Sequence, residues 1–298
     1  MTRRQPTTFL VGAGPVATAI AGALRLGGVP VLGLWARRAA QARAAGSTAG
    51  VAAFSSAPPD VLLECEVIVL AVRDQVIGEV AQMLVGTGLV NKRHVLLHCA
   101  GAASAKELLG EVADQVAGIG TMHPLSAIAD GKAAMRALKG TVFGIEGDEV
   151  GRSAAARLVG AMGGVVLALD STQMPAYHAA AALASNYIVA AIDAAASILA
   201  GVGVAPDAAA QALVPLAEGA LRNIAAHGTT AGLTGPVRRG DAATIQRHLD
   251  ALRGRPELIE VYRALARRAV EIAGRIDGRD APDRAGLDAI RALLDLTR

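Results

Sequence analysis

Cysteine, aromatic residues and lysine are all scarce in this chain of 298 residues. Its two cysteines, Cys65 and Cys99, exclude a disulfide framework and have no metal-ligand spacing, so we expect a cytoplasmic protein without a metal site. Aromatic residues make up 2% of the chain, and nearly all of the 29 basic residues are arginines. No basic block with interleaved aromatics occurs, which argues against a nucleic-acid partner.

Apolar residues are abundant, at 53% of the chain, so a large core can form without disulfides. The stretch 177–201 is long and apolar enough to cross a bilayer, yet it contains His178, Asn186 and Asp193. A membrane helix tolerates such polar groups only against other helices or water, and no second span is present to supply them. The sequence therefore predicts a buried central helix of a soluble protein, with no membrane partner.

The two halves of the chain have different periodicities. Up to about residue 170, short β-rich runs alternate with helical patterns, and several runs are apolar on both faces, which is typical of a parallel sheet covered on both sides. Beyond that point only helices are predicted, over 172–200, 205–227, 241–253, 255–276 and 282–297. We therefore expect two domains, 1–170 and 171–298, with an α/β doubly wound sheet followed by an all-helical part.

A glycine turn follows the first predicted strand, in "FLVGAGPVATAIAGAL". Gly12 permits the tight turn, Gly14 lets the backbone approach a pyrophosphate, and Ala17 lets the helix pack close to the strand. Pro15 and Val16 begin that helix, whose N-terminal amides favour an anion. The turn predicts a dinucleotide-binding site, and a plain tight turn is the alternative.

The second predicted strand ends in "LGLWARR", where an NAD-binding protein usually has an acidic residue. Arg37 and Arg38 instead favour the 2′-phosphate of NADP(H), because guanidinium groups bind phosphate and a carboxylate repels it. The alternative is two solvated arginines at a helix start. Ala71 and Val72, at the end of a later strand, are predicted to pass beside the middle of the cofactor.

Two histidines, His98 and His123, are predicted at the carboxyl ends of the fifth and sixth strands, where open parallel sheets bind ligands. A histidine there can donate a proton to a carbonyl or imine as hydride arrives. Pro124 fixes the backbone after His123, and Ser126 follows in the same stretch as a candidate substrate contact. The alternative for each histidine is a side chain that only bonds a backbone carbonyl.

Seven stretches carry a resemblance to a known family and together span most of the chain. They are "GAGPVATAIAGAL", "ECEVIVLAVRDQVI", "HCAGAAS", "GTMHPLSAI", "YHAAAALASNYIVA", "LTGPVRRGD" and "VYRALARRAVEIA". The sequence resembles Rossmann-like reductases with a helical C-terminal domain of unknown function, which are related to pyrroline-5-carboxylate reductase, deazaflavin-dependent NADP reductases and ketopantoate reductase. The resemblance implies an NADP(H)-binding Rossmann-type domain, a helical dimerisation and substrate domain, and a homodimer.

One catalytic position of the related enzymes is missing here. Related β-hydroxyacid dehydrogenases and ketopantoate reductase have a catalytic lysine and, four residues later, an asparagine on the equivalent helix. Asn186 matches the asparagine, but Ala182 occupies the lysine position. The resemblance then leaves Asn186 to orient the substrate and His123 or His178 to supply a proton. An imine substrate fits more easily, because an iminium needs less acid assistance.

A loop in the helical half, "LTGPVRRGDAATIQRHL", runs into a helix that Asp241 is predicted to cap. Residues 234–239 are a candidate anion-binding loop, in which Thr234 and either Arg238 or Arg239 hold a substrate carboxylate. The alternative is a helix-entry turn with exposed arginines.

The sequence thus predicts an NADP(H)-dependent oxidoreductase that acts on a small carbonyl or imine compound bearing a carboxylate. Two alternatives stay open: a ketopantoate-type 2-dehydropantoate reductase, and a dinucleotide-binding sensor or scaffold that catalyses nothing. The missing lysine keeps the second alternative open. The predicted catalytic residues are His123, Asn186 and His178, and the predicted substrate contacts are His98, Ser126, Thr234 and Arg239.

Overall fold

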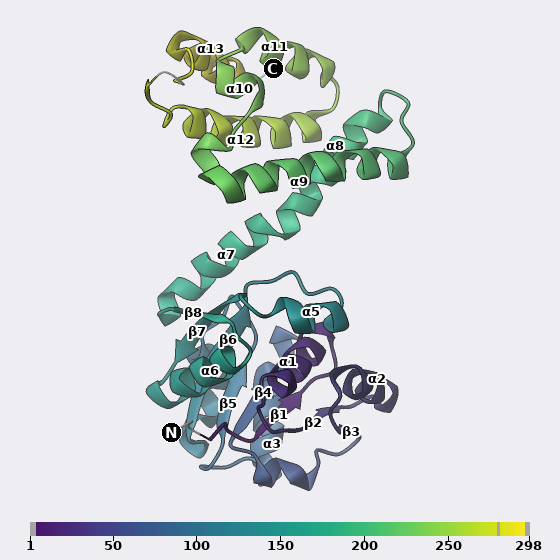
Figure 1. The fold of residues 1–298 in the computed structure, drawn as a ribbon, viewed down its shortest axis with the longest axis vertical. Helices are drawn as coiled ribbons and strands as arrows, with labels where there is room; N and C mark the ends of the chain where they lie inside the picture. The colour runs from purple at the N-terminus through teal and green to yellow at the C-terminus, as the bar shows by residue number, and fades with distance from the viewer. Residues whose placement is uncertain (1–3, 279–280, 296–298) are drawn as a thin grey trace. The chain divides into compact units, whose positions relative to one another are not determined.

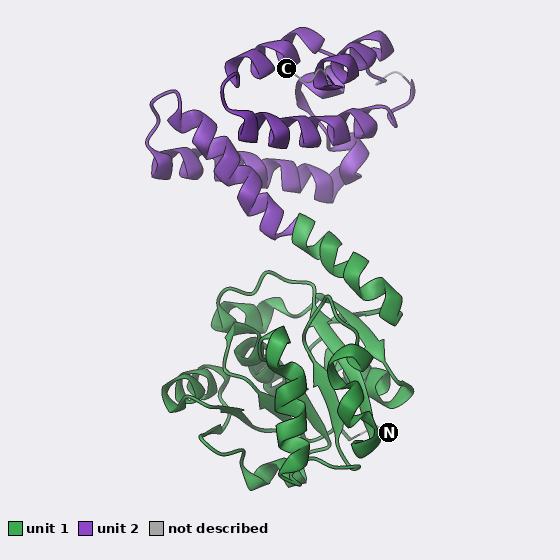
Figure 2. Ribbon diagram, turned by 180° about the vertical axis from the view of Figure 1, so that it is seen from behind, with its two compact units in different colours: residues 1–183 green, residues 184–298 purple. Residues whose placement is uncertain are grey.

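A computed structural model describes residues 4–278 and 281–295. The chain divides into two compact units, unit 1 (Met1–Leu183) and unit 2 (Ala184–Arg298), shown in different colours in Figure 2. We had placed the domain boundary after residue 170, directly after the last strand. The division lies further along the chain, so that most of the helix after the sheet belongs to unit 1.

Unit 1 is built on one 8-stranded sheet with the strand order β3-β2-β1-β4-β5-β6-β7-β8 (Figure 1). Its strands are β1 (Thr8–Val11), β2 (Val31–Ala36), β3 (Ala53–Ser55), β4 (Val67–Leu70), β5 (Val95–His98), β6 (Gly118–Pro124), β7 (Val142–Gly147) and β8 (Val165–Ala168). The order 3-2-1-4-5-6 with parallel pairing is that of a Rossmann-type domain. The predicted α/β doubly wound class is confirmed.

Two details of the sheet differ from the prediction. The three-residue strand β3 was missed, because it is too short to give a periodic signal. The sheet is mostly parallel as predicted, with one exception: β7 runs antiparallel to β6. The Leu125 N–H donates to the Val142 carbonyl at 2.8 Å, so the chain re-enters the sheet at the end where β6 leaves it.

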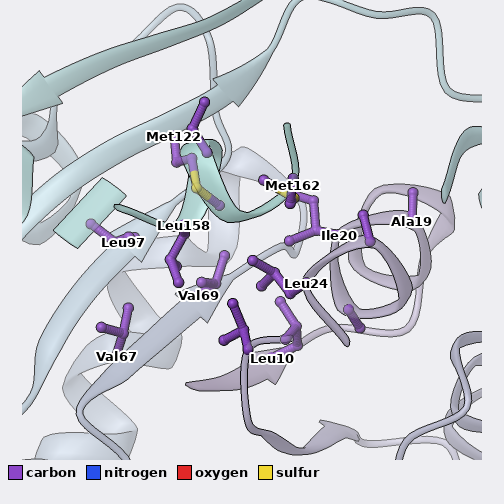
Figure 3. Packing of buried hydrophobic residues seen from close by; sticks show 14 of the residues in the cluster. Leu10, Ala19, Ile20, Leu24, Val67, Val69, Leu97, Met122, Leu158 and Met162 are labelled. Atoms are coloured by element: carbon purple, nitrogen blue, oxygen red, sulfur yellow. The ribbon is translucent and has the colours of Figure 1, made fainter. Parts of the chain in front are cut away.

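Helices cover both faces of this sheet. They are α1 (Pro15–Leu26), α2 (Ala39–Ala49), α3 (Ile77–Gly86), α4 (Ala105–Leu109), α5 (Gly131–Ala137) and α6 (Glu149–Ala161). Helix α7 (Met174–Ala184) follows the last strand and leads away from the sheet (Figure 1). Strand β1 is buried along its whole length: Leu10 packs toward α1 and α6, while Phe9 and Val11 pack into the opposite face with α3. Figure 3 shows the first of these two cores, with Leu10 and Val69 of the sheet beside Ile20 and Leu24 of α1.

Unit 2 is entirely helical in the part of the chain that the structure describes. Its helices are α8 (Asn186–Ala200), α9 (Pro206–Ala231), α10 (Gly235–Arg239), α11 (Ala242–Ala251), α12 (Pro256–Ala273) and α13 (Arg284–Asp295). The core is formed by α10 to α13, around Ile245, Val270 and Ile290. The short helix α10 lies where we expected a loop, and the last two residues of the predicted helix 282–297 lie outside the described residues.

The long apolar segment is divided, and the prediction of one buried helix was wrong. Ser171–Ala200 is the one described stretch that could span a membrane by length and composition alone. It breaks at Ser185 (φ −128°, ψ −79°) into α7 and α8. Met174 is the buried residue of α7, and α8 has none within this chain.

Candidate functional site

A cavity of about 760 Å³ opens at the carboxyl ends of β1, β2, β4 and β5. All eight predicted cofactor contacts line it: Gly12, Gly14, Pro15, Val16, Arg37, Arg38, Ala71 and Val72. Because parallel strands present their carboxyl ends at one edge, the sheet brings together turns that are far apart in sequence. The cavity also includes Cys99, whose thiol has a pKa raised to about 12 by burial and then by Asp74, so the thiol stays protonated.

The two glycines of the turn have different reasons to be glycine. Gly12 has φ +135°, and a Cβ there would lie 2.2 Å from the Ala71 carbonyl oxygen, so the fold itself excludes a side chain. Gly14 has φ −78°, and a Cβ there would meet nothing within 4 Å. The fold therefore does not require glycine at position 14, and the missing side chain leaves the backbone there open to the cavity. Helix α1 begins at Pro15 without a side-chain cap, so its N-terminal amides face that space.

Arg37 and Arg38 follow β2 as predicted and are exposed at the cavity. Among the residues that the structure describes, neither arginine has an ion-pair partner. The carboxylates of the lining, Asp74 and Glu79, come instead from the segment after β4. Two free guanidinium groups at the end of β2 suit the 2′-phosphate of NADP(H) better than a ribose hydroxyl.

A second group of side chains gathers at the end of β6. The His123 Nδ1 atom lies 3.0 Å from the Tyr177 hydroxyl, which also lies 3.3 Å from the His123 carbonyl oxygen. The rings of His123 and His178 are 5.7 Å apart in an edge-to-face arrangement. Strand β6 therefore brings one predicted catalytic residue next to another from α7, together with a tyrosine that we did not predict.

Two glycines make room for these rings. A Cβ on Gly101, after β5, would lie 2.6 Å from His178 Cδ2 and 2.7 Å from His123 Nε2. A Cβ on Gly144, in β7, would lie 2.7 Å from Tyr177 Cζ. These distances are too short for a Cβ unless the rings move. Glycine at both positions therefore leaves room for the histidine–tyrosine cluster. Their sequence signal, glycines beside strand ends, is too common to interpret alone.

Burial, and then the neighbouring His178, lower the pKa of His123 to about 4. Burial raises the pKa of Tyr177. At neutral pH the His123 ring is therefore uncharged and the tyrosine keeps its proton. A neutral imidazole is a weak acid, so the cluster fits poorly with the expectation that His123 donates a proton.

His98 occupies a closed polar network instead of facing a ligand. It is fully buried, its Nδ1 accepts from the Ala100 N–H at 3.2 Å, and its Nε2 lies 3.1 Å from Thr121 Oγ1. Thr121 in turn donates to Glu146 at 3.4 Å. Burial lowers the pKa of His98 to about 4. A hydrogen bond with the Ser104 backbone raises this pKa, and nearby His123 lowers it further. The structure thus favours the alternative of a satisfied strand-end histidine over a substrate contact.

The remaining predicted residues lie elsewhere. Ser126 is exposed in the loop after β6, whereas Asn186, Thr234 and Arg239 are exposed residues of unit 2. Asp241 caps α11 as predicted, because its carboxylate accepts from the Thr244 N–H at 3.0 Å. The described residues contain no cluster of histidine, cysteine or acidic side chains arranged to hold a metal ion.

Residues 141–269, from the start of β7 into α12, match a family model described as a domain of unknown function, DUF2520. The match covers less than half of the chain. The resemblance to Rossmann-like reductases with a helical C-terminal domain is confirmed in fold. No curated protein matches the chain.

Solved structures similar to this chain share its fold over nearly their whole length. Protein TM1727 of Thermotoga maritima is 24% identical, with a TM-score of 0.70, over 89% of this chain and 97% of its own. BF3122 of Bacteroides fragilis, whose name assigns it to the NADP oxidoreductases, is 23% identical, with a TM-score of 0.68, over 90% and 99%. A pyrroline-5-carboxylate reductase of Coxiella burnetii is 19% identical, with a TM-score of 0.59, over 91% and 99%.

Proposed function

We propose that the protein is an NADP(H)-dependent oxidoreductase that acts on a small carbonyl or imine compound bearing a carboxylate. The observation that carries this proposal is the cavity in which the glycine turn and two unpaired arginines meet. The names of BF3122 and of the Coxiella burnetii reductase support it, since both refer to the same kind of chemistry on the same fold.

The residues of the cavity fit NADP(H) part by part. Gly14 and the start of α1 hold the pyrophosphate, Arg37 and Arg38 hold the 2′-phosphate, and Ala71 and Val72 border the path toward the nicotinamide. When bound, the nicotinamide supplies or accepts the hydride. The protein's own part is to orient the cofactor, exclude water and position the substrate near His123.

A titration tests the cofactor assignment directly. We expect NADPH to bind more tightly than NADH. In an Arg37→Ala, Arg38→Ala double variant, the ratio of the NADH and NADPH dissociation constants should fall by about tenfold to a hundredfold for each arginine removed. Arg43→Ala is the matched control, because this exposed arginine of α2 does not line the cavity. Equal binding of both nucleotides by wild type, or failure of both to bind, would overturn the assignment.

Turnover separates the proposal from its two alternatives. A ketopantoate-type reductase consumes NADPH with 2-dehydropantoate but not with cyclic imines, and a sensor binds NADPH without consuming it under any condition. The proposed enzyme consumes NADPH with a carboxylate-bearing imine or keto acid. Arg239 and Thr234, proposed to bind the substrate carboxylate, and Asn186, proposed to orient the reacting group, belong to unit 2 and stay predictions.

The proposal includes a soluble, cytoplasmic homodimer formed through the helical half. Its support is the exposure of large apolar side chains near the break between α7 and α8: Leu183, Tyr187 and Val189 are 63%, 57% and 70% exposed. Large apolar side chains exposed close together in the sequence favour a protein–protein interface. Both cysteines are free thiols, as expected in a reducing compartment.

A further inference from the structure

The hydroxyl of Tyr177 restricts where His123 can carry its proton. One oxygen lies within hydrogen-bonding distance of two His123 atoms, Nδ1 at 3.0 Å and the carbonyl oxygen at 3.3 Å. The carbonyl can only accept, and the hydroxyl has one proton to give. Both contacts are satisfied together only if the hydroxyl donates to the carbonyl and Nδ1–H donates to the hydroxyl oxygen.

That arrangement leaves Nε2 of a neutral His123 without a proton. No donor among the described residues reaches this atom. Among the described residues, the buried side-chain polar atoms that lack a partner belong to Gln5, Trp35 and Arg263, and His123 Nε2 is not one of them. This atom lies beside Gly101, where a Cβ would come within 2.7 Å of it, so glycine at this position leaves the room that the ring edge needs.

We propose that Tyr177 is a positioning residue that keeps the proton of His123 on Nδ1 and presents the bare Nε2 as a hydrogen-bond acceptor for a substrate N–H group. The ring is held neutral by its burial and by His178, in line with its lowered pKa. The other ionisable groups around it are Tyr177, which stays protonated, and His98, which is itself buried.

The bare Nε2 favours an imine over a carbonyl substrate. This substrate assignment rests on the proposed function. Reduction of a protonated imine forms one C–H bond with the hydride of NADPH, and the C=N π pair moves to a nitrogen that already carries its proton. No acid is needed, and the N–H of the iminium donates to Nε2. A ketone needs an additional proton on oxygen, which a bare Nε2 cannot supply.

The position of the proton can be measured without turnover. In full-length protein labelled with ¹⁵N-histidine, two-bond ¹H–¹⁵N spectra at pH 7 should show a protonated Nδ1 and an unprotonated Nε2 for His123, whose signal is identified by its loss in His123→Asn. A wild-type ring protonated on Nε2, or doubly protonated, would overturn the proposal without any need for a tyrosine variant.

Removal of the hydroxyl then tests Tyr177 itself. In Tyr177→Phe we expect the His123 proton to move largely to Nε2. Tyr262→Phe is the matched control, because this tyrosine contacts Nδ1 of the exposed His248 at 2.8 Å in the same edge-to-face geometry and should leave the His123 signal unchanged. An unchanged His123 tautomer in Tyr177→Phe would contradict the assigned role.

The substrate part has its own test. With NADPH, kcat/KM for 1-pyrroline-2-carboxylate should exceed that for 2-oxopentanoate, which has the same carbon number, by about a hundredfold or more. Tyr177→Phe should lower kcat for the imine by roughly tenfold with KM for NADPH unchanged. Equal rates, or turnover of neither compound, would sink the imine assignment. NADPH binding in the same samples shows whether the cofactor assignment has failed with it.

Discussion

Helices α1 and α8 have similarly apolar sequences and opposite environments. Helix α1 (PVATAIAGALRL) buries eight of its 12 residues against the sheet of unit 1, whereas α8 (NYIVAAIDAAASILA) buries none of its 15 residues. Apolar side chains favour burial, and within the described chain those of α1 are buried while those of α8 are not. The exposed apolar surface of α8 is the physical basis for the homodimer in our proposal.

An acidic residue introduced into each helix gives the largest contrast. Ile20→Asp places an unpaired carboxylate at a fully buried site in α1 and should cost more than about 4 kcal/mol, enough to unfold unit 1. Val189→Asp, at a side chain that is 70% exposed, should leave circular dichroism and NADPH binding intact and convert the dimer into a monomer. Light scattering after size exclusion measures the second effect. A monomeric wild type would contradict the proposal that α8 is buried in a dimer interface.

Acid should lower the stability of unit 1 more than that of unit 2, by a smaller amount than the Ile20→Asp substitution. The pKa of His98 is lowered from 6.5 to about 4, so its contribution is complete above pH 6.5 and is lost as the pH falls toward 4. The full shift corresponds to about 3 kcal/mol for this buried ring. The histidines of unit 2, His227 and His248, are exposed. Hydrogen exchange at pH 7 and pH 4.5 should therefore show opening of unit 1 first.

His98→Asn serves as the control for the acid effect, because asparagine does not titrate in this range. This variant should weaken the pH dependence of unit 1 while His123, whose pKa is lowered to about 4, keeps part of it. Equal acid sensitivity of the two units would show that the buried histidines do not govern the stability of unit 1.

The smallest effect concerns a helix cap in unit 2. Asp241→Ala removes the acceptor for the Thr244 N–H and should lower the melting temperature of unit 2 by roughly 3 to 5 °C. Asp241→Asn keeps an acceptor oxygen and should recover most of the loss. NADPH affinity should stay unchanged in Asp241→Ala. A loss of binding free energy as large as the loss of stability would show that unit 2 contributes to cofactor binding.

Local sequence signals were enough to predict residues that the structure brings together in one cavity. Gly12, Gly14, Arg37 and Arg38 all lie at the predicted cavity, because a turn between a strand and a helix is fixed by neighbouring residues and by the edge at which parallel strands end. The cap at Asp241 was predictable for the same reason. These features depend on contacts over a few residues and on one rule of sheet topology.

The histidine–tyrosine cluster was only partly predictable. His123 and His178 are marked by their positions, but the partner of His123 Nδ1 is Tyr177, 54 residues away in sequence. The antiparallel direction of β7, which places Gly144 opposite His123, has no signal in the strand itself. Long-range pairing of this kind depends on how the chain re-enters the sheet.

The sequence by itself determined the α/β class, the glycine turn and the pair of arginines that follows β2, since each is set by short-range features of the chain. Only the tertiary structure decided that His98 is buried with both nitrogens paired, while His123 pairs Nδ1 with Tyr177 and has no partner at Nε2 among the described residues. Both histidines end apolar strands, and their difference comes from the groups that neighbouring strands and α7 place around each ring. Solvation and hydrogen-bond partners, which set a histidine's protonation, are properties of that three-dimensional environment.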